Sequence, residues 1–432
     1  MYQQKILTAV LFLMLTACSA GKQHRTTAPE TPDQFVDENM THAAGLLNRL
    51  LDKADIGFSA PKGAYPRTID KKGALVTTSM YDWTPGFFPG SLWYAYEYSK
   101  NEVLKNEAIR WTEKLEPLKK FTEHHDLGFM MYCSYGNAYR LTHNNAYKEI
   151  LVQAARSLCT RFDPRVGSIK SWNRFVSWHG NKTYYYPVIV DNLMNLELLF
   201  FASEASGDPS FKNIAVAHAT NAMKNQVRPD YSTYHVVAYD TASDKVEGRE
   251  TAQGYADNST WARGQAWAIY GFTMIYRFTK DPQFLKTAEG LADYYVNNKN
   301  LPADKIPYWD FNVKQTGYTP GVRSNALHVT PLYRDASAAA ITASALLELS
   351  GYVNDRKAAG YREFAKATLH SLGSPAYRAE PGTNGNFILK HSVGSIPHNA
   401  EIDVPLVYAD YYFLEALLRY KKLAHGEKLT SE

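Results

Sequence analysis

One segment carries the strongest structural signal in this chain: Ala336-Ser-Ala-Ala-Ala-Ile-Thr-Ala-Ser-Ala-Leu-Leu-Glu-Leu349. It is dense in small helix formers and carries apolar residues around most of its circumference. A helix that is apolar nearly all round has to be buried. Three further segments share this character: Leu193–Ala205, Trp261–Phe278 and Val404–Tyr420. The sequence therefore predicts a protein built around several buried helices.

The turns that follow these helices resemble one another. Ser206-Gly-Asp-Pro-Ser-Phe211 and Phe278-Thr-Lys-Asp-Pro-Gln-Phe284 both place Asp-Pro where a more amphipathic helix begins. Asp is a preferred capping residue, and Pro suits the first helical position. Such recurrence is typical of a repeat architecture.

Six buried helices can be counted from their starts, which lie near Thr84, Asp126, Asp191, Ser259, Asp335 and Asp403. An amphipathic partner follows five of them, and Asp33–Leu51 can supply the sixth. Six inner and six outer helices in alternation predict an all-α fold, an (α/α)6 barrel in a single domain. The alternative is an open solenoid, whose end repeats need polar caps that this sequence does not show.

The N-terminus carries a targeting signal. Lys5 precedes the apolar run Ile6–Leu15, as in a secretory signal. Leu15-Thr-Ala-Cys18 resembles a bacterial lipobox, which predicts a lipoprotein signal peptide over residues 1–17 and lipidation of Cys18. The alternatives are an ordinary signal peptide and a short anchor helix. Residues 18–33 predict a flexible tether and residues 34–425 the barrel domain. We expect a bacterial lipoprotein that is periplasmic or anchored to the outer membrane by its lipid alone.

The composition narrows the possible partners. The net charge is only +4 and no basic run matches a phosphate backbone, which excludes nucleic acid. The 31 Tyr, 19 Phe and 8 Trp offer flat apolar faces with polar tips, which suit sugar rings. After Cys18, only Cys133 and Cys159 remain, which predicts two buried thiols rather than a disulfide framework.

The chemically distinctive residues lie at the starts of the buried helices. Because the inner helices of such a barrel all run the same way, their starts share one mouth. This places Asp126, Asp191, Trp261, Arg263 and Trp267 around a single cleft. Helix N-termini direct partial positive charge and free N–H groups into that mouth, which favours an anionic ligand.

A purely structural interpretation competes with this one. Asp is a preferred helix cap, and four aspartates lie at or near predicted helix starts: Asp126, Asp191, Asp335 and Asp403. A capping Asp accepts N–H bonds that lower its pKa, whereas a general acid needs a raised pKa. Metal binding by His124, His125 and His235 has no support from a His-Glu-x-x-His spacing. The convergence of acidic, aromatic and Arg residues on one mouth favours a ligand site.

Four motifs cover these helix starts: His125-Asp-Leu-Gly-Phe129, Asp191-Asn-Leu-Met-Asn195, Gln253-Gly-Tyr-Ala-Asp-Asn-Ser-Thr-Trp-Ala-Arg-Gly-Gln-Ala-Trp267 and Asp403-Val-Pro-Leu-Val-Tyr-Ala-Asp-Tyr-Tyr-Phe-Leu-Glu-Ala-Leu-Leu418. Together they resemble the unsaturated glucuronyl hydrolases of glycoside hydrolase family 88. The likeness runs from Asp33 to Lys422. It implies an (α/α)6 barrel and a reaction without a metal or organic cofactor.

The resemblance also implies a mechanism. Polysaccharide lyases leave a 4,5-double bond in the terminal uronic acid. In this family an Asp protonates C4 of that vinyl ether, water adds at C5, and the hemiketal collapses to release the sugar. By motif, Asp191 corresponds to the general acid/base and Asp126 to the supporting carboxylate. The positions that line the uronate subsite correspond to His235, Gln253, Trp261, Arg263 and Trp267.

This role poses a question about the proton on Asp191. An Asp that faces positive helix ends is ionised by default and is a poor acid. We hypothesise that Asp126 across the mouth and the apolar walls of Trp261 and Trp267 hold the proton there near neutral pH.

The expected partners are unsaturated uronic-acid disaccharides or oligosaccharides. A Ser-x-x-Ser-x-Lys pattern favours sulfated substrates in some family members, and here it corresponds to Ser392-Val-Gly-Ser395-Ile-Pro397. Ser392 and Ser395 are therefore predicted to bind substrate, although Pro397 replaces the Lys. We expect chondroitin or hyaluronan disaccharides first and heparin-type products second.

Three other functions compete with this expectation. They are an unsaturated rhamnogalacturonyl hydrolase acting on pectin fragments, a non-catalytic lipid-anchored glycan-binding protein, and a sugar epimerase. An epimerase needs acid and base on opposite faces of a sugar, and the adjacent His124 and His125 make a poor pair for that purpose.

Overall fold

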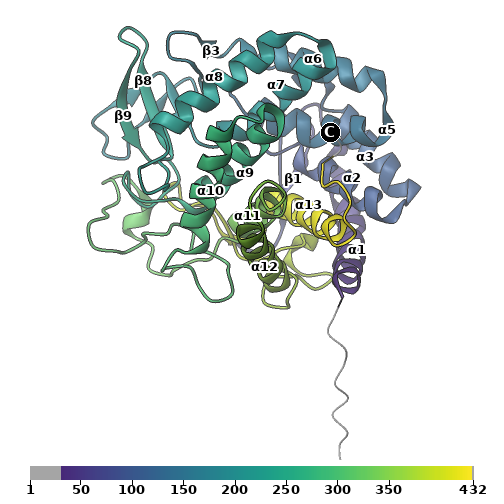
Figure 1. The fold of residues 1–432 in the computed structure, drawn as a ribbon. Helices are drawn as coiled ribbons and strands as arrows, with labels where there is room; N and C mark the ends of the chain where they lie inside the picture. The colour runs from purple at the N-terminus through teal and green to yellow at the C-terminus, as the bar shows by residue number, and fades with distance from the viewer. Residues whose placement is uncertain (1–30, 431–432) are drawn as a thin grey trace, which may run out of the picture. The chain divides into compact units, whose positions relative to one another are not determined.

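The computed structural model describes residues 31–430, in which two sets of helices alternate along the chain (Figure 1). The inner set consists of α2 (Phe87–Ser99), α4 (Leu127–Met131) with its continuation α5 (Asn137–Thr142), α7 (Asn192–Ser206), α9 (Ala262–Thr279), α11 (Ala336–Leu349) and α13 (Val407–Ala424). The outer set consists of α1 (Pro32–Phe58), α3 (Glu102–Glu113), α6 (Asn145–Cys159), α8 (Pro209–Asn225), α10 (Pro282–Val296) and α12 (Asp355–Leu372). A π-helical turn, Tyr132–Gly136, joins α4 to α5.

The inner helices form a closed ring. Each contacts the next in chain order, and α13 packs against both α11 and α2. Each outer helix packs against an inner neighbour, as the pairs α9–α10 and α11–α12 illustrate in Figure 1. This arrangement confirms the predicted (α/α)6 barrel and is not an open solenoid.

Burial follows the sequence pattern closely. Every residue of α11 is buried, as its small and apolar composition predicts. Where α9 crosses α7, Gly271 allows close approach, because a Cβ at this position would lie 2.6 Å from the Cβ of Leu193. Asp208 and Asp281 each accept a backbone N–H at the start of an outer helix that begins with Pro. The repeated turn signal therefore has its predicted meaning.

Two predicted boundaries are wrong. Asp403 does not start a helix: it lies in β11 (Ala400–Val404) and is ion-paired with His391. Residues that precede a proline favour extended backbone, so Val404 before Pro405 keeps the chain extended until α13 begins at Val407. At the other end α1 begins at Pro32, so residues 32 and 33 are helical rather than part of a tether. The signal peptide, Cys18 and the rest of the predicted tether lie outside the described residues.

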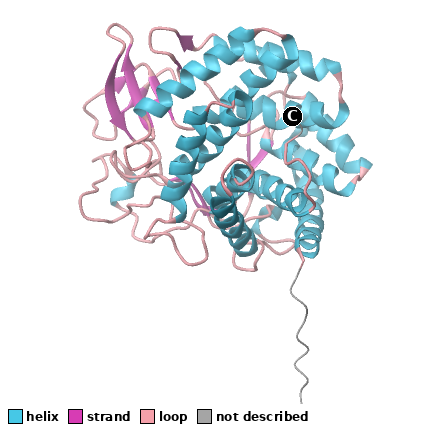
Figure 2. Cartoon of the chain, viewed as in Figure 1, coloured by secondary structure: helices cyan, strands magenta, loops and turns pink. Residues whose placement is uncertain are grey.

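Short antiparallel hairpins connect many of the helices, and the sequence analysis did not foresee them (Figure 2, magenta). The two-stranded hairpins are β1 (Tyr65–Ile69) with β2 (Leu75–Thr78), β3 (Phe162–Asp163) with β4 (Ser168–Ile169), β5 (Phe175–Val176) with β6 (Thr183–Tyr184), and β10 (Ser392–Ser395) with β11. A three-stranded sheet has the order β7 (Pro187–Ile189), β8 (Val236–Asp240) and β9 (Lys245–Glu250). These strands set the positions of several predicted site residues.

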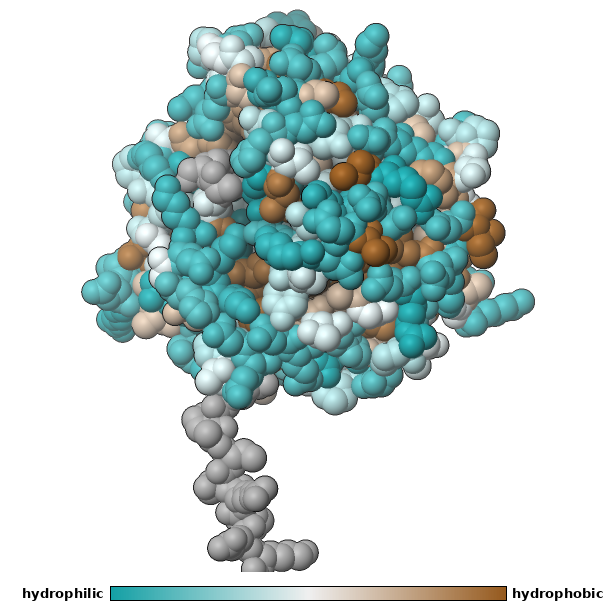
Figure 3. Space-filling model, turned by 90° about the vertical axis from the view of Figure 1, so that its right-hand side faces the viewer, coloured by the Kyte–Doolittle hydropathy of each residue, from teal (hydrophilic) through white to brown (hydrophobic). Residues whose placement is uncertain are grey.

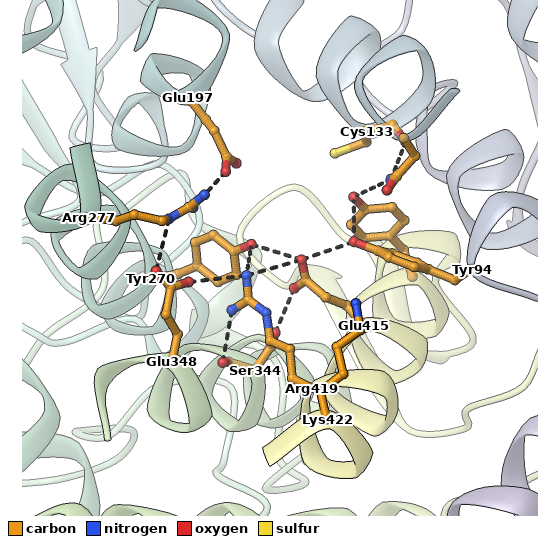
Figure 4. A network of polar contacts seen from close by, with 12 residues as sticks. Tyr94, Cys133, Glu197, Tyr270, Arg277, Ser344, Glu348, Glu415, Arg419 and Lys422 are labelled. Atoms are coloured by element: carbon orange, nitrogen blue, oxygen red, sulfur yellow. Dashed lines mark hydrogen bonds and ion pairs between the residues drawn. The ribbon is translucent and has the colours of Figure 1, made fainter. Parts of the chain in front are cut away.

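A buried polar network ties inner helices together toward their C-terminal ends (Figure 4). Glu415 of α13 accepts hydrogen bonds from the hydroxyls of Tyr94 (3.0 Å), Tyr270 (2.9 Å) and Ser344 (2.6 Å). These three donors come from α2, α9 and α11, so one carboxylate connects four inner helices.

A chain of ion pairs extends this network to α7. Glu348 pairs with Arg419 at 3.1 Å and with Arg277 at 3.0 Å, and Arg277 also pairs with Glu197 at 2.7 Å. All four side chains are at most 15% exposed, so each charge depends on its partners.

The outer surface is mainly polar. On the face shown in Figure 3, apolar residues are scattered among hydrophilic ones. Among residues 31–430, none of the helices is long and apolar enough to cross a membrane. Cys133 and Cys159 are free thiols, as predicted, but only Cys133 is buried, and Cys159 is partly exposed.

Candidate active site

The three-stranded sheet brings together the three segments that carry Asp191, His235 and Gln253. Its register pairs Ile189 with Val236 and Val236 with Glu250. The residues just beyond these positions are Val190, His235 and Thr251, so Asp191 and the loop that carries Gln253 are held next to His235. The N–H of Val190 donates to the carbonyl of His235 at 3.0 Å.

Backbone hydrogen bonds determine which nitrogen of His235 carries the proton. Its Nδ1 accepts the N–H groups of Ala252 (3.1 Å) and Gln253 (3.2 Å). Burial, together with the charge of Arg263, holds the pKa of His235 well below its usual range, so the ring is neutral. The single ring proton must therefore lie on Nε2. Nε2 faces Asp191, with its Oδ1 at 3.6 Å.

Asp191 occupies the N-cap position of α7 but caps nothing. Its side chain accepts no hydrogen bond from the first turn of the helix, and Oδ1 is buried without a hydrogen-bond partner among residues 31–430. Burial raises its pKa to about 7; the charge of Asp126 adds to this rise and that of Arg263 opposes it. Asp191 can therefore hold a proton near neutral pH, which a capping Asp could not do.

Asp126 occupies the same N-cap position on α4, but its pKa is shifted in the opposite direction. Burial alone would raise its pKa, but the adjacent His125 and His124 hold it below the usual range. The Nδ1 of His124 lies 3.1 Å from Oδ2, and the Nε2 of His125 lies 3.4 Å from Oδ1. Its side chain also makes no capping bond. The structure thus contains one carboxyl group whose pKa is lowered and one whose pKa is raised to about 7.

The start of α9 supplies the aromatic and cationic part of the site. The ring of Trp261 lies 4.4 Å from that of His235, and the guanidinium of Arg263 lies 4.4 Å from the Trp261 ring. The indole nitrogen of Trp261 and the Nε of Arg263 are buried and have no partner among the described residues. With Asp191 Oδ1 and His235 Nε2, they form a group of unpaired polar atoms of the kind that marks a ligand site.

The charge of Arg263 is nonetheless already balanced. It pairs with Asp335 at 2.9 Å, and its terminal nitrogens donate to the carbonyls of Val393 and Gly394. Asp335 also caps α11 by accepting the N–H of Ser337. Arg263 therefore fixes β10 against the helix starts, and its Nε keeps an N–H without a partner among the described residues.

A cleft of about 520 Å³ opens beside this group. Gln253 and Ser395 line it, and the Nε2 of Gln253 donates to the Gly394 carbonyl at 3.2 Å. Asp126 and Asp191 are outside its lining, and each is 8% exposed. Gln253 connects the cleft to Asp191, because its N–H donates to Nδ1 of His235, whose Nε2 lies 3.6 Å from Asp191 Oδ1.

Of the nine predicted catalytic and substrate-binding residues, only Gln253 and Ser395 line this cleft, and His235, Trp261 and Arg263 are buried outside its lining. Two others lie deeper still. Trp267 is fully buried inside the barrel, between Phe129 and Tyr412, and does not line the cleft. Ser392 is also fully buried, whereas Ser395 reaches the cleft and lies 2.6 Å from the Nδ1 of His398.

Comparison with known proteins agrees with this geometry. The family model described as Glycosyl Hydrolase Family 88 matches residues 64–297. An unsaturated glucuronyl hydrolase from Formosa agariphila is 41% identical over 422 residues, which is 97% of this chain and 99% of the relative. This chain belongs to glycoside hydrolase family 88.

Other relatives of family 88 extend the likeness to solved structures. A crystal structure of an unsaturated glucuronyl hydrolase specific for heparin superposes with a TM-score of 0.82 at 45% identity, covering 91% of this chain and 98% of that one. An unsaturated chondroitin disaccharide hydrolase from Streptococcus pyogenes is 31% identical over 90% of this chain and 95% of its own length. The protein is therefore a glycosidase of the unsaturated glucuronyl hydrolase type.

The sequence analysis missed several residues of this family 88 cleft. They are Arg67, Trp83, Trp172, Arg174, Trp178, Arg323, Glu401 and Tyr408. Most come from loops and hairpins, whereas Trp83 lies just before α2 and Tyr408 lies in the first turn of α13. The only local signal was the density of aromatic and basic residues over 172–178. Among residues 31–430, no group of three His, Cys, Asp or Glu is placed to hold a metal.

Proposed function

We propose that this enzyme removes the 4,5-unsaturated uronic acid from lyase-produced glycosaminoglycan oligosaccharides by acid-catalysed hydration. Asp191 carries the proposal, because a buried carboxyl group with a pKa near 7 and an unpartnered oxygen is suited to donate a proton at neutral pH. The chemistry follows the family resemblance, and the geometry supports the assignment of roles.

In the first step the proton of Asp191 forms a bond to C4 with the electrons of the C4=C5 double bond. The positive charge that develops at C5 is shared with the ring oxygen. Water then adds to C5 and returns a proton to the Asp191 carboxylate. The resulting hemiketal opens, and the hemiacetal formed at C1 collapses to release the remaining sugar.

Asp126 assists without touching the transferred proton. Because His124 and His125 keep it ionised, its negative charge raises the pKa of Asp191. It also favours the positive charge that develops on the sugar ring. The Nε2 of His235 lies 3.6 Å from Oδ1 of Asp191, beyond hydrogen-bond distance, so Oδ1 has no partner among residues 31–430.

We propose heparin-type disaccharides as the first substrate class and chondroitin-type disaccharides as the second. This reverses the order expected from sequence, because the heparin-specific relative is 45% identical and the chondroitin enzyme 31%. The test is a panel of unsaturated disaccharides with defined sulfation, followed by loss of the double-bond absorbance. Turnover of none of the glycosaminoglycan disaccharides, with turnover of a pectin-derived unsaturated disaccharide, would overturn the proposal.

We further propose that the enzyme is exported and lipidated at Cys18, as its N-terminal sequence suggests. In a bacterial host, radiolabelled palmitate should be incorporated into the wild-type chain and not into Cys18→Ala. Equal labelling of both chains would refute lipidation at this residue.

A further inference from the structure

Two arginines of the cleft carry charges that nothing else neutralises. Arg174 lies directly before β5, and Arg323 lies in the long loop between α10 and α11; both line the cleft. Within residues 31–430, neither guanidinium makes a hydrogen bond or an ion pair. The third arginine of the cleft, Arg67, differs because its Nε lies 2.6 Å from Glu401. The cleft lining therefore keeps two uncompensated positive charges.

Three loops hold these arginines in place. The backbone N–H of Arg323 donates to the carbonyl of Trp178 at 2.9 Å, and its side chain packs on Gly180, where a Cβ would lie 2.9 Å from Cδ. The N–H of Asn325 donates to the carbonyl of Pro397 at 3.1 Å. Arg323 is thereby fixed between the β5–β6 hairpin and the turn between β10 and β11. Arg174 precedes the same hairpin.

The surrounding groups complete a site for a hydrogen-bonding anion. Ser395 and His398 lie in the turn beside Arg323, and Ser395 Oγ contacts His398 Nδ1 at 2.6 Å. Burial lowers the pKa of His398, so this pair adds polar atoms without adding charge at neutral pH. Guanidinium groups bind oxyanions through paired N–H donors, which suits the oxygens of a sulfate.

We propose that Arg174 and Arg323 form a subsite for a sulfate group on the sugar linked to the unsaturated uronic acid. The proposal rests on the proposed function and names the feature that selects among its substrates. Gln253 lines the cleft and donates its N–H to Nδ1 of His235, whose Nε2 lies 3.6 Å from Asp191 Oδ1. A sugar linked to a uronate that reacts at Asp191 is therefore expected to lie in the cleft that the two arginines line. A sulfated disaccharide then gains two charge-assisted contacts that an unsulfated one cannot make.

The test compares two unsaturated disaccharides that share sugars and linkage and differ only in one sulfate. Arg174→Gln, Arg323→Gln and the double variant are assayed for kcat/KM on each. The ratio of sulfated to unsulfated kcat/KM should fall about tenfold for each arginine, the effect of one partly exposed charge-assisted hydrogen bond. A matched control is Lys182→Gln, which removes one charge from the same hairpin where Lys182 pairs with Glu247 at 2.9 Å, outside the cleft. Its ratio should stay at the wild-type value.

The outcomes separate the alternatives. Equal losses on both disaccharides would assign the arginines to the carboxylate that both substrates carry, and would overturn the sulfate subsite. An unchanged ratio in the double variant, or the same fall in Lys182→Gln, would overturn it as well.

Binding distinguishes failure of the subsite from failure of the proposed function. If the wild-type enzyme turned over neither disaccharide, the proposed function would fail, and the subsite would still be tested by calorimetric titration with the same two ligands. Tighter binding of the sulfated ligand that is lost in the double variant supports the subsite. Equal binding of both ligands by wild-type protein refutes it.

Discussion

Asp191 occupies a position where aspartates usually cap a helix, but its carboxyl group bonds to nothing in that helix. Asp335 occupies the same position on α11 and does cap, with a salt bridge to Arg263 in addition. The two residues are therefore a natural matched pair for separating catalysis from stability.

Replacing Asp191 with Asn should abolish turnover and leave the fold intact. We expect kcat to fall by about 10² to 10⁴, the usual contribution of a general acid. Far-ultraviolet circular dichroism should be unchanged, since no capping bond is lost. Asp335→Asn should instead lower stability, because a buried cap and ion pair are both disturbed. Full activity in Asp191→Asn, or a loss of its helical signal, would contradict the assignment of Asp191 as the acid.

The same Asn variant should stabilise the protein at alkaline pH. The pKa of Asp191 is raised to about 7 in the folded state, so between its unfolded value near 3.9 and 7 the folded state binds the extra proton. Stability therefore falls as pH rises through this window. The total cost above pH 7 is about 4 kcal/mol for three pKa units. Urea denaturation at pH 5 and pH 8 should show a gain for Asp191→Asn that is larger at pH 8. A gain that is equal at both pH values would mean that the wild-type carboxyl group does not titrate in this range.

Asp126 should control the pH at which Asp191 loses its proton. Asp191 is active as an acid only when protonated, so kcat should decline as pH rises through about 7. In Asp126→Asn the negative charge that raises the Asp191 pKa is gone, and the residual activity should decline at lower pH. The pH dependence of kcat for both enzymes measures this shift. If kcat declines at the same pH in both enzymes, burial alone sets the pKa of Asp191.

At the scale of the helices, the polar network in Figure 4 holds the inner ring together at a distance from the reacting groups. Glu348→Ala should destabilise the protein by about 3–5 kcal/mol, because Arg277 and Arg419 would each lose a buried partner. Guanidinium denaturation measures the loss, and kcat/KM at a temperature where the variant is folded should be close to wild type. Glu102→Ala, which breaks an exposed pair with Lys105, is the control and should leave the denaturation curve unchanged. Similar losses in both variants would show that burial of the network is not what makes it stabilising.

The existence and order of the helices could be predicted from sequence. Whether the Asp at a given helix start caps that helix could not. Apolar composition identifies α11, and Asp-Pro identifies the start of α10. The N-cap positions of Asp126, Asp191 and Asp335 are equally well marked, but which carboxylate is used as a cap depends on tertiary partners such as Arg263, 72 residues from Asp335 in the chain.

The strands and the cleft rim were harder to predict for a similar reason. β7 has three residues and no alternation that distinguishes it from a loop, although it places Asp191 beside His235. Arg174 and Arg323 are isolated in their loops, and only the folded hairpins bring them to one cleft. Local patterns therefore specify the scaffold, and long-range contacts specify which residues line the cleft.

At the scale of the whole barrel, the two ends of the described helical ring meet. His425 near the end of α13 lies 2.8 Å from Asp33 at the start of α1, and Lys421 lies 2.9 Å from Asp37. A closed ring with adjacent ends has no structurally unique starting point. For folding, the order of the helical hairpins along the chain should therefore matter less than closure of the ring that they form.

A circular permutant tests this directly. We expect a chain that joins residue 427 to residue 32 through a linker of about six residues, able to span about 20 Å, and that opens between Gly207 and Asp208 to fold and to retain turnover. These two residues are exposed in the turn after α7, and Asp191 of the candidate active site lies at the other end of that helix. A second permutant that opens between Ala252 and Gln253 is the counterpart, because it breaks the loop whose N–H groups hold the tautomer of His235. It should fold and lose turnover. Both chains are measured by circular dichroism melting and by kcat/KM. Loss of cooperative unfolding in the first permutant would show that ring closure alone does not support the fold. Equal activity in the two permutants would show that His235 has no part in catalysis.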